Sequence, residues 1–283
     1  MQDYNFLDLF SGVGGFALGA RNAGFDFSHH FNSDVSTYAN AVYARHFPES
    51  LNLGDIRKIN GFKLRDKYPG EWIVCGGFPF PDLSTANRKR KGLNGERSGL
   101  FFEMLRLIDE LRPSYVLAEN VAALTFSGLD RVLLSLAKIG YDAEWQTLSA
   151  ASFGAPHQRD RLWLLAYPSG SADASGPLLE PSRDWIQQFF ACRDDMADGG
   201  ESDVCAERDR PWSDWAGEIS AWEMAGQSYV RRVDALISEG VDVENWQDRG
   251  IALGNSVVPV IPEFLFRLIK DRSDSSQASF ASR

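Results

Sequence analysis

The first residues in the chain with a chemical signature are the glycines of a turn near the N-terminus. An apolar run from Tyr4 to Phe10 leads into Ser11-Gly12-Val13-Gly14-Gly15, and an amphipathic stretch follows. A glycine-rich turn between a strand and a helix places backbone N–H groups and a helix N-terminus beside a bound cofactor. The segment therefore predicts a cofactor site at the end of the first strand.

Two carboxylates follow at positions that suit the same cofactor. Asp34 ends the second predicted strand, where it can accept hydrogen bonds from ribose hydroxyls. Asp55 closes a third unit and can accept a hydrogen bond from an exocyclic adenine amine. With the glycine turn, the two acids predict a cofactor that contains adenosine. These residues alone do not distinguish a nicotinamide cofactor from S-adenosylmethionine.

Alternating strands and helices must position these residues. Short apolar runs predict strands over residues 4–10, 25–32, 72–75, 115–118, 145–149 and 162–166. Apolar residues at helical spacing predict helices over residues 16–24, 35–47, 100–111, 129–139 and 257–269. This alternation is typical of an α/β domain with a mostly parallel sheet that is covered on both faces.

We expect four parts in the chain. Residues 1–168 hold the alternating elements and form the first domain. Residues 169–248 are rich in Ser, Gly, Asp and Trp and show little periodicity, which predicts a small irregular lobe. Residues 249–271 then return to the first domain, and the Ser-rich residues 272–283 are expected to form a disordered tail.

Composition limits the class of protein. No apolar stretch of about 18 residues is present, and the N-terminus lacks the pattern of a signal peptide. The three cysteines, Cys75, Cys192 and Cys205, show no CxxC spacing. We therefore expect a cytoplasmic protein in a reducing setting, with no membrane association, no structural metal and no disulfide.

The total charge argues against a nucleic-acid partner. The net charge is −10, whereas phosphate binding needs clustered Lys and Arg. Local runs at Arg88 to Lys91 and Arg159 to Arg161 are basic, and much of the acid lies between Asp173 and Glu244. A bare basic run is more often a solvated loop than a phosphate clamp. The charge therefore weakens a DNA-binding interpretation without excluding it.

Seven blocks of the chain, read in order, resemble the motifs of DNA cytosine-5 methyltransferases. The blocks are Asp8-Leu9-Phe10-Ser11-Gly12-Val13-Gly14-Gly15, Gly54-Asp55-Ile56, Gly76-Gly77-Phe78-Pro79 with Asp82-Leu83-Ser84, Arg97-Ser98-Gly99-Leu100, Glu119-Asn120-Val121, Gln158-Arg159-Asp160-Arg161 and Gly254-Asn255-Ser256-Val257-Val258-Pro259. The resemblance implies the Rossmann-like fold of S-adenosylmethionine-dependent methyltransferases. It also implies S-adenosylmethionine as cofactor and duplex DNA as partner, with the target base flipped out of the duplex.

The resemblance assigns a set of residues to the cofactor. They are Phe10, Gly12, Gly14, Asp34, Asp55, Ile56 and Asn255. Asp34 stands where the family usually has Glu for the ribose, so its reach is shorter by one methylene. Asp55 and Ile56 would hold the adenine, and Asn255 would cap the pocket from the C-terminal segment.

A second set of residues is assigned to the base. Glu119 would bind the flipped cytosine at N3 and at its amine. Arg159 and Arg161 would bracket the base and the catalytic loop, while His157 takes a position that Gln often occupies.

The catalytic motif departs from the family. The family reads Pro-Cys-Gln, and this chain reads Pro79-Phe80-Pro81. Attack at C6 of cytosine needs a thiolate, which makes C5 electron-rich enough to take the methyl group. Phe80 stands at the position of the missing Cys and has no lone pair to offer. Cys75 lies about 16 Å away along an extended chain and is expected to be a buried structural cysteine.

Three interpretations of function remain open. In the first, the chain is an S-adenosylmethionine-dependent member of the DNA (cytosine-5) methyltransferase family that acts on a base flipped out of duplex DNA, and the replacement of the nucleophile by Phe80 leaves its activity open. Alternatively, it is a pseudoenzyme that holds DNA, cofactor or a partner without methyl transfer. In the third interpretation it is an amino-methyltransferase, acting at N4 or N6, in which Phe80 stacks on the base. Gly77 and Phe78 disfavour this last one, because they stand where a polar residue and a first proline should be.

Residues 169–248 take the place of the family's target-recognition region. The aromatic and basic residues in it that suit DNA contact are Trp185, Trp212, Trp215, Trp222, Arg183, Arg208 and Arg210. Tryptophans in a small lobe more often form its own core. We expect a monomer. The sequence does not determine the DNA target or whether a cognate restriction endonuclease exists.

Overall fold

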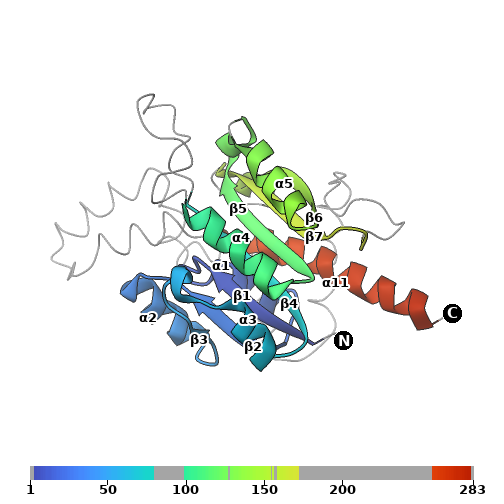
Figure 1. Cartoon of the computed structure of the whole chain (residues 1–283). Helices are drawn as coiled ribbons and strands as arrows, with labels where there is room; N and C mark the ends of the chain where they lie inside the picture. Colours follow the sequence, from blue (N-terminus) through green and yellow to red (C-terminus); the bar gives the residue numbers. More distant parts are fainter. Residues whose placement is uncertain are drawn as a thin grey trace, which may run out of the picture. The chain divides into compact units, whose positions relative to one another are not determined.

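The computed structural model describes residues 3–79, 99–126, 128–153, 155, 158–171 and 257–281. The chain divides into two compact units. The first comprises Met1–Leu148, Asp160–Leu179 and Ser256–Arg283, and the second comprises Ser149–Arg159 and Glu180–Asn255. Figure 1 labels helices and strands of the described residues, and nearly all of the described elements belong to the first unit.

A seven-stranded sheet forms the centre of the first unit. Its strands are β1 (Tyr4–Leu9), β2 (Phe27–Ser33), β3 (Leu51–Asn52), β4 (Glu71–Gly77), β5 (Tyr115–Val121), β6 (Tyr141–Ser149) and β7 (Asp160–Pro168). They lie in the order β3-β2-β1-β4-β5-β7-β6. Strands β1 to β5 pair in parallel, and β7 runs antiparallel to β5. The expected mostly parallel sheet is confirmed.

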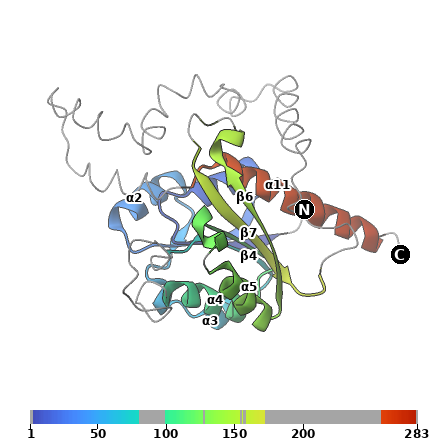
Figure 2. The same cartoon turned by 90° about the horizontal axis from the view of Figure 1, so that it is seen from above.

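Helices cover both faces of this sheet. They are α1 (Gly15–Asn22), α2 (Thr37–His46), α3 (Gly61–Lys67), α4 (Gly99–Leu111), α5 (Leu129–Lys138) and α11 (Val260–Ala281). The 3-10 helices η1 (Ile56–Lys58) and η3 (Ala122–Phe126) also belong to the first unit, whereas η4 (Ala150–Phe153) belongs to the second. In Figure 2, α3, α4 and α5 lie on one side of the sheet and α11 lies on the other.

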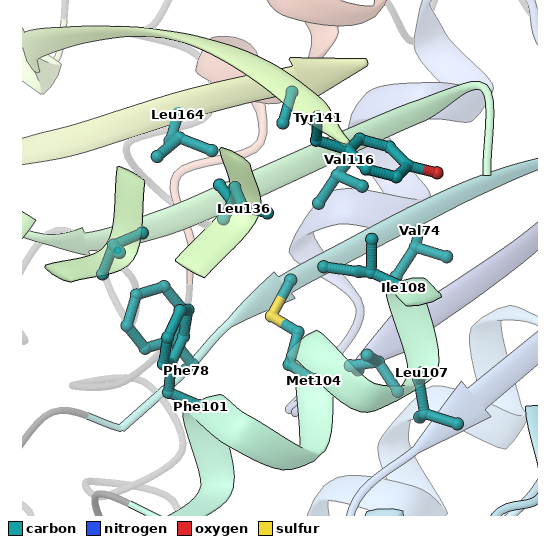
Figure 3. Packing of buried hydrophobic residues seen from close by; sticks show 14 of the residues in the cluster. Val74, Phe78, Phe101, Met104, Leu107, Ile108, Val116, Leu136, Tyr141 and Leu164 are labelled. Carbon is teal, nitrogen blue, oxygen red and sulfur yellow. The ribbon is translucent and has the colours of Figure 1, made fainter. Parts of the chain in front are cut away.

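One hydrophobic core lies between the sheet and the helices α4 and α5. On α4, Met104, Leu107, Ile108 and Leu111 recur at helical spacing and are all at most 2% exposed. They face alternate residues of the strands, such as Val74 of β4, because successive side chains of a strand point to opposite faces (Figure 3). This packing fixes the carboxyl ends of β4 and β5.

The opposite face of the sheet packs against α1 and α11. The Phe6 and Phe266 rings contact each other edge-on with centroids 6.1 Å apart, and Phe16 contacts Trp163 at 5.8 Å. Gly19 allows the two helices to approach closely, because a Cβ there would lie 2.7 Å from the backbone nitrogen of Glu263. The C-terminal helix therefore forms part of the first unit.

Two elements differ from the sequence-based expectation. Helix α3 was not expected, and it begins where the Asn60 side chain accepts a hydrogen bond from the Lys63 N–H at 2.9 Å. The tail expected to be disordered over 272–283 is instead helical through Ala281. The reason is visible at Ser273, which is buried and whose hydroxyl lies 3.0 Å from the Tyr4 hydroxyl and 2.9 Å from the Ile269 carbonyl oxygen.

Candidate functional site

The candidate site lies at the carboxyl ends of the parallel strands. The chain passes from β1 to β2 and β3 on one side, and β4 pairs with β1 on the other side. Such a reversal of strand order leaves a crevice beyond the carboxyl ends of the strands, where ligands bind in α/β sheets. The residues that follow β1, β2, β4 and β5 therefore belong to one edge of the sheet. Phe80, His157 and Asn255 lie outside the described residues.

The turn after β1 is held in backbone conformations that favour glycine. Phe10, Gly12 and Gly14 have φ values of 53°, 52° and 96°. At Gly14, the N-cap of α1, a Cβ would lie 2.8 Å from the Phe47 ring, whereas a Cβ at Gly12 would meet no atom within 4 Å. Gly14 is thus required by packing. Gly12 leaves open space beside the turn for a ligand to approach the backbone.

Asp34 joins the end of β2 to this turn. One oxygen of its carboxylate accepts a hydrogen bond from the Gly12 N–H at 2.9 Å, and the other accepts from the Ser36 N–H at 2.8 Å. A carboxylate has about four acceptor positions, so two backbone donors leave capacity for a ribose hydroxyl. The structure therefore brings Gly12, Gly14 and Asp34 together in one arrangement.

The segment Gly54 to Ile56 is the third part of the predicted cofactor site. It is tied to β2 because the Ser33 hydroxyl donates to the Gly54 carbonyl oxygen at 2.6 Å. Asp55 caps η1 and accepts from the Arg57 N–H at 3.0 Å and from the Arg57 guanidinium at 2.6 Å. The hydrogen bonds from Arg57 lower the pKa of Asp55 to about 2. Ile56 is 4% exposed and packs in the core rather than lying open.

Glu119 and Arg161 form an ion pair at the ends of β5 and β7. The Arg161 Nε lies 2.9 Å from Glu119 Oε1, and the two side chains are 24% and 13% exposed respectively. In the antiparallel pairing of β5 with β7, Val121 lies opposite Arg161 and Glu119 lies opposite Trp163. This register brings the Glu119 carboxylate close to the Arg161 guanidinium. Gly77 leaves room for the carboxylate, since a Cβ there would lie 3.0 Å from Glu119 Oε2. A carboxylate acceptor and a guanidinium donor thus stand side by side in a charge-assisted pair.

Asn120 has a role that the sequence did not reveal. Its side-chain amide donates to the Phe78 carbonyl oxygen at 2.8 Å, and its side-chain oxygen accepts from the Val121 N–H at 2.9 Å. The residue is buried, and Phe78 also packs against Phe101 with ring centroids 5.0 Å apart. Asn120 therefore anchors the segment that leads from β4 to Phe80. The Glu-Asn-Val block was its sole sequence signal.

Arg159 belongs to the second unit. It follows a short closed segment in which the Gln158 carbonyl oxygen accepts from the Ser149 hydroxyl at 2.7 Å and from the Ala150 N–H at 2.8 Å. Arg159 itself has a φ of 38°, which is uncommon for a residue with a side chain. Its role at the base stays a prediction.

Cys75 is not a substitute nucleophile. It is fully buried on β4, and burial raises the pKa of its thiol well above the usual value, so the thiolate is disfavoured.

Within the part of the chain that the structure describes, no group of three or more His, Cys, Asp or Glu side chains is arranged to hold a metal ion. Among the same residues, no helix has the length and apolarity needed to cross a membrane.

Several bacterial proteins are similar to this chain. The type II methyltransferase M.NgoBI of Neisseria gonorrhoeae is 32% identical over 201 residues, which cover 66% of this chain and 61% of the relative. M.HhaI of Haemophilus parahaemolyticus is 30% identical over 166 residues, 57% of this chain and 48% of the relative. M.DsaV of Dactylococcopsis salina is 30% identical over 170 residues, 59% and 46% respectively. The chain thus spans 46% to 61% of the length of these relatives.

Solved structures show the same fold. The S. pombe Dnmt2 methyltransferase superposes with a TM-score of 0.52 at 22% identity, over 71% of this chain and 57% of that chain. A Spodoptera frugiperda DNMT2 mutant superposes with a TM-score of 0.51 at 24% identity, over 60% and 51%. The Rossmann-like methyltransferase fold is therefore confirmed.

A family model decides the membership. The model of the C-5 cytosine-specific DNA methylases matches residues 4–191, which hold the glycine turn, Asp55, Glu119 and Arg161. The chain belongs to the C-5 cytosine-specific DNA methylase family.

Proposed function

We propose that the chain binds S-adenosylmethionine beyond the carboxyl ends of β1 and β2. The observation that carries this proposal is the link from Asp34 to Gly12, which shapes a turn with open space at Gly12 and spare acceptor capacity at Asp34. Asp34 would accept from the ribose, and the Asp55 carboxylate would accept from the adenine amine. Bound there, the cofactor would supply an electrophilic methyl group.

We also propose that the paired side chains Glu119 and Arg161 receive a cytosine flipped out of duplex DNA. The Glu119 carboxylate, held by Arg161 at 2.9 Å, would face N3 and the amine of the base. Arg161 would keep that carboxylate oriented when DNA is absent. Asn120 would hold the end of β4 in place beside this pair through its bond to the Phe78 carbonyl oxygen.

Covalent methyl transfer is absent from this proposal. Phe80 has no nucleophilic atom, and the buried Cys75 thiol is held in its protonated form. We therefore propose a family member that binds cofactor and DNA but does not form the C6 adduct that cytosine-5 methylation needs.

Mass spectrometry of nucleosides tests this function. Mixed-sequence duplex DNA is incubated with S-adenosylmethionine and either the parent protein or Phe80→Cys. We expect no methylated base from the parent and 5-methylcytosine from the variant. 5-Methylcytosine from the parent would overturn the proposal, and N4-methylcytosine or N6-methyladenine would replace it with amino-methyl transfer.

A further inference from the structure

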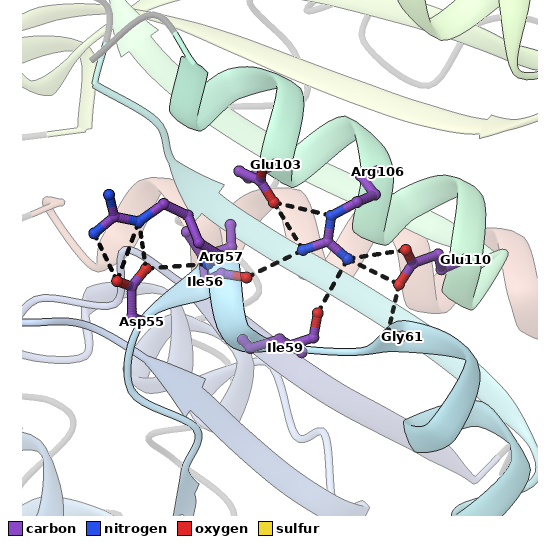
Figure 4. A network of polar contacts seen from close by, with 8 residues as sticks. All are labelled: Asp55, Ile56, Arg57, Ile59, Gly61, Glu103, Arg106 and Glu110. Atoms are coloured by element: carbon purple, nitrogen blue, oxygen red, sulfur yellow. Dashed lines mark hydrogen bonds and ion pairs between the residues drawn. The ribbon is translucent and has the colours of Figure 1, made fainter. Parts of the chain in front are cut away.

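Arg106 on α4 holds the segment that carries Asp55. Its Nη2 donates to the Ile56 carbonyl oxygen at 3.2 Å, and its Nη1 donates to that of Ile59 at 3.0 Å. Ile56 begins η1 and Ile59 is the C-cap of η1. A single guanidinium therefore fixes both ends of this short helix (Figure 4).

Two carboxylates of α4 orient that guanidinium. Glu103 accepts from Arg106 Nε at 2.9 Å, and Glu110 accepts from Nη1 at 2.9 Å. Glu110 also accepts from the N–H of Gly61, the first residue of α3, at 2.6 Å. Charge-assisted bonds to the planar fork of Arg are stronger and more directional than neutral ones. The backbone from Ile56 to Gly61 is thereby fastened to α4.

The packing around this network is close. A Cβ on Gly61 would lie 2.7 Å from the Glu110 side chain, so α3 meets α4 without spare room. Ile56 and Ile59 belong to the same buried core as Leu107 of α4. The placement of η1 is thus set by α4 through both apolar contact and the Arg106 bonds.

Asp55 takes its orientation from η1. It is the N-cap of this helix, and its carboxylate accepts from the Arg57 N–H at 3.0 Å. Any shift of η1 would therefore move the carboxylate with it. Binding sites lose discrimination when a recognising group is displaced by about half an ångström.

We propose that Arg106 is a positioning residue that sets the preference of the site for the adenine amine. The inference rests on the proposed adenine contact of Asp55. An ionised carboxylate accepts hydrogen bonds and cannot donate them, so it favours an amine over a carbonyl at the purine 6-position. Arg106 acts on this choice through η1 and does not touch the cofactor.

Calorimetric titration with two ligands tests the proposal. S-adenosylhomocysteine carries the amine, and S-inosylhomocysteine carries a carbonyl in its place. We expect the parent to prefer the first by about tenfold, and Arg106→Met to reduce that ratio at least about threefold. Arg112→Met is the matched control, since Arg112 also bonds a carboxylate and a carbonyl, those of Asp109 and Ile139, but not η1. Its ratio should equal the parent's.

The remaining outcomes are equally decisive. An unchanged ratio in Arg106→Met overturns the proposal, whatever happens to thermal stability. If that variant fails to fold, Arg106→Lys takes its place, because an ammonium keeps the charge between the carboxylates but cannot span both carbonyls; an unchanged ratio there also overturns it. A parent that binds both ligands equally overturns the adenine contact together with the role of Arg106. A parent that binds neither ligand contradicts the proposed function itself.

Discussion

The two halves of the proposed site, one for the cofactor and one for the base, are built by different means. The cofactor half comprises Phe10 to Gly14, Asp34 and Gly54 to Ile56, and it is shaped by positive φ values and by bonds to backbone groups. The base half comprises Gly77 to Pro79, Glu119 to Val121 and Arg161, and it depends on side chains from different strands. Shape and chemistry are therefore carried by separate groups of residues.

This difference explains how one function can be lost without the other. A change of the side chain at position 80, which follows the base half in the sequence, would remove a nucleophile but leave the backbone of the cofactor half unchanged. The Glu119–Arg161 ion pair is formed, and Asn120 bonds the carbonyl oxygen of Phe78, two residues before Phe80 in the sequence. The comparison predicts that the proposed loss is confined to covalent chemistry.

The largest expected effect is the formation of a covalent adduct with DNA when Phe80→Cys supplies a nucleophile. With S-adenosylmethionine and duplex DNA that contains 5-fluorodeoxycytidine, Phe80→Cys should form an adduct that survives denaturing electrophoresis. The thiolate adds to C6, the methyl group adds to C5, and the fluorine then blocks elimination. The parent should form at least about a thousandfold less, as expected when a covalent nucleophile is missing. An adduct with the parent would show that another residue acts as the nucleophile. It would contradict the claim that covalent chemistry is lost while the cofactor half is kept.

A smaller effect is expected from the base half in that active background. Adding Glu119→Gln to Phe80→Cys should lower the rate of methylation by about a hundredfold, since the carboxylate that faces the base is lost. Gln keeps an acceptor for Arg161, so the fold should persist. Asp109→Asn, which alters an exposed carboxylate on α4, should leave the rate unchanged. A full rate with Glu119→Gln would remove Glu119 from the base site.

The glycines of the cofactor half should separate stability from binding. Gly14→Ala should lower the free energy of unfolding by about 2–3 kcal/mol, because a Cβ at φ 96° overlaps the Phe47 ring. Gly12→Ala should lower it by about 1 kcal/mol through its φ of 52° alone, and should weaken S-adenosylhomocysteine binding more strongly than its stability loss implies. Urea denaturation and calorimetry measure the two quantities. Equal stability losses would contradict this assignment.

The smallest effect concerns Asp8 on β1. Asp8 lies opposite Cys75 of β4, so it stands where the strand that leads to the cofactor half pairs with the strand that leads to the base half. Burial raises the pKa of Asp8 well above its usual value. The hydrogen bond from the Tyr43 hydroxyl at 3.2 Å lowers this pKa, but by less than burial raises it. Above the folded-state pKa the ionised, buried group costs stability, and this cost vanishes as the pH falls toward the unfolded-state value of about 3.9. Asp8→Asn should therefore stabilise the protein more at pH 8 than at pH 5, by on the order of 1 kcal/mol. Denaturation curves that show no pH dependence of this difference would refute it.

Much of the fold was predictable because its signals are local. The glycine turn, the apolar spacing of α4 and the alternation of elements each lie within a short window of sequence, and the structure has them where they were expected. The sequence predicted that Glu119 and Arg161 both lie near the base, but it did not predict that they form an ion pair with each other.

The contacts that escaped prediction join distant residues through backbone carbonyls. Asn120 bonds Phe78, and Arg106 bonds Ile56 from 50 residues away; such bonds leave no periodic pattern. Helix α3 was missed because it is seven residues long with mixed polarity. The C-terminal helix was underestimated because its serines suggested solvation, whereas Ser273 bonds back to β1 through Tyr4.

Calorimetric titration of S-adenosylmethionine into the parent and into Phe80→Cys tests the central claim most directly. If the cofactor half is independent of the missing nucleophile, the two proteins should bind with dissociation constants within about twofold of each other, a difference of less than about 0.5 kcal/mol. Binding by the variant alone, or by neither protein, would show that the cofactor half is not intact and would contradict the account.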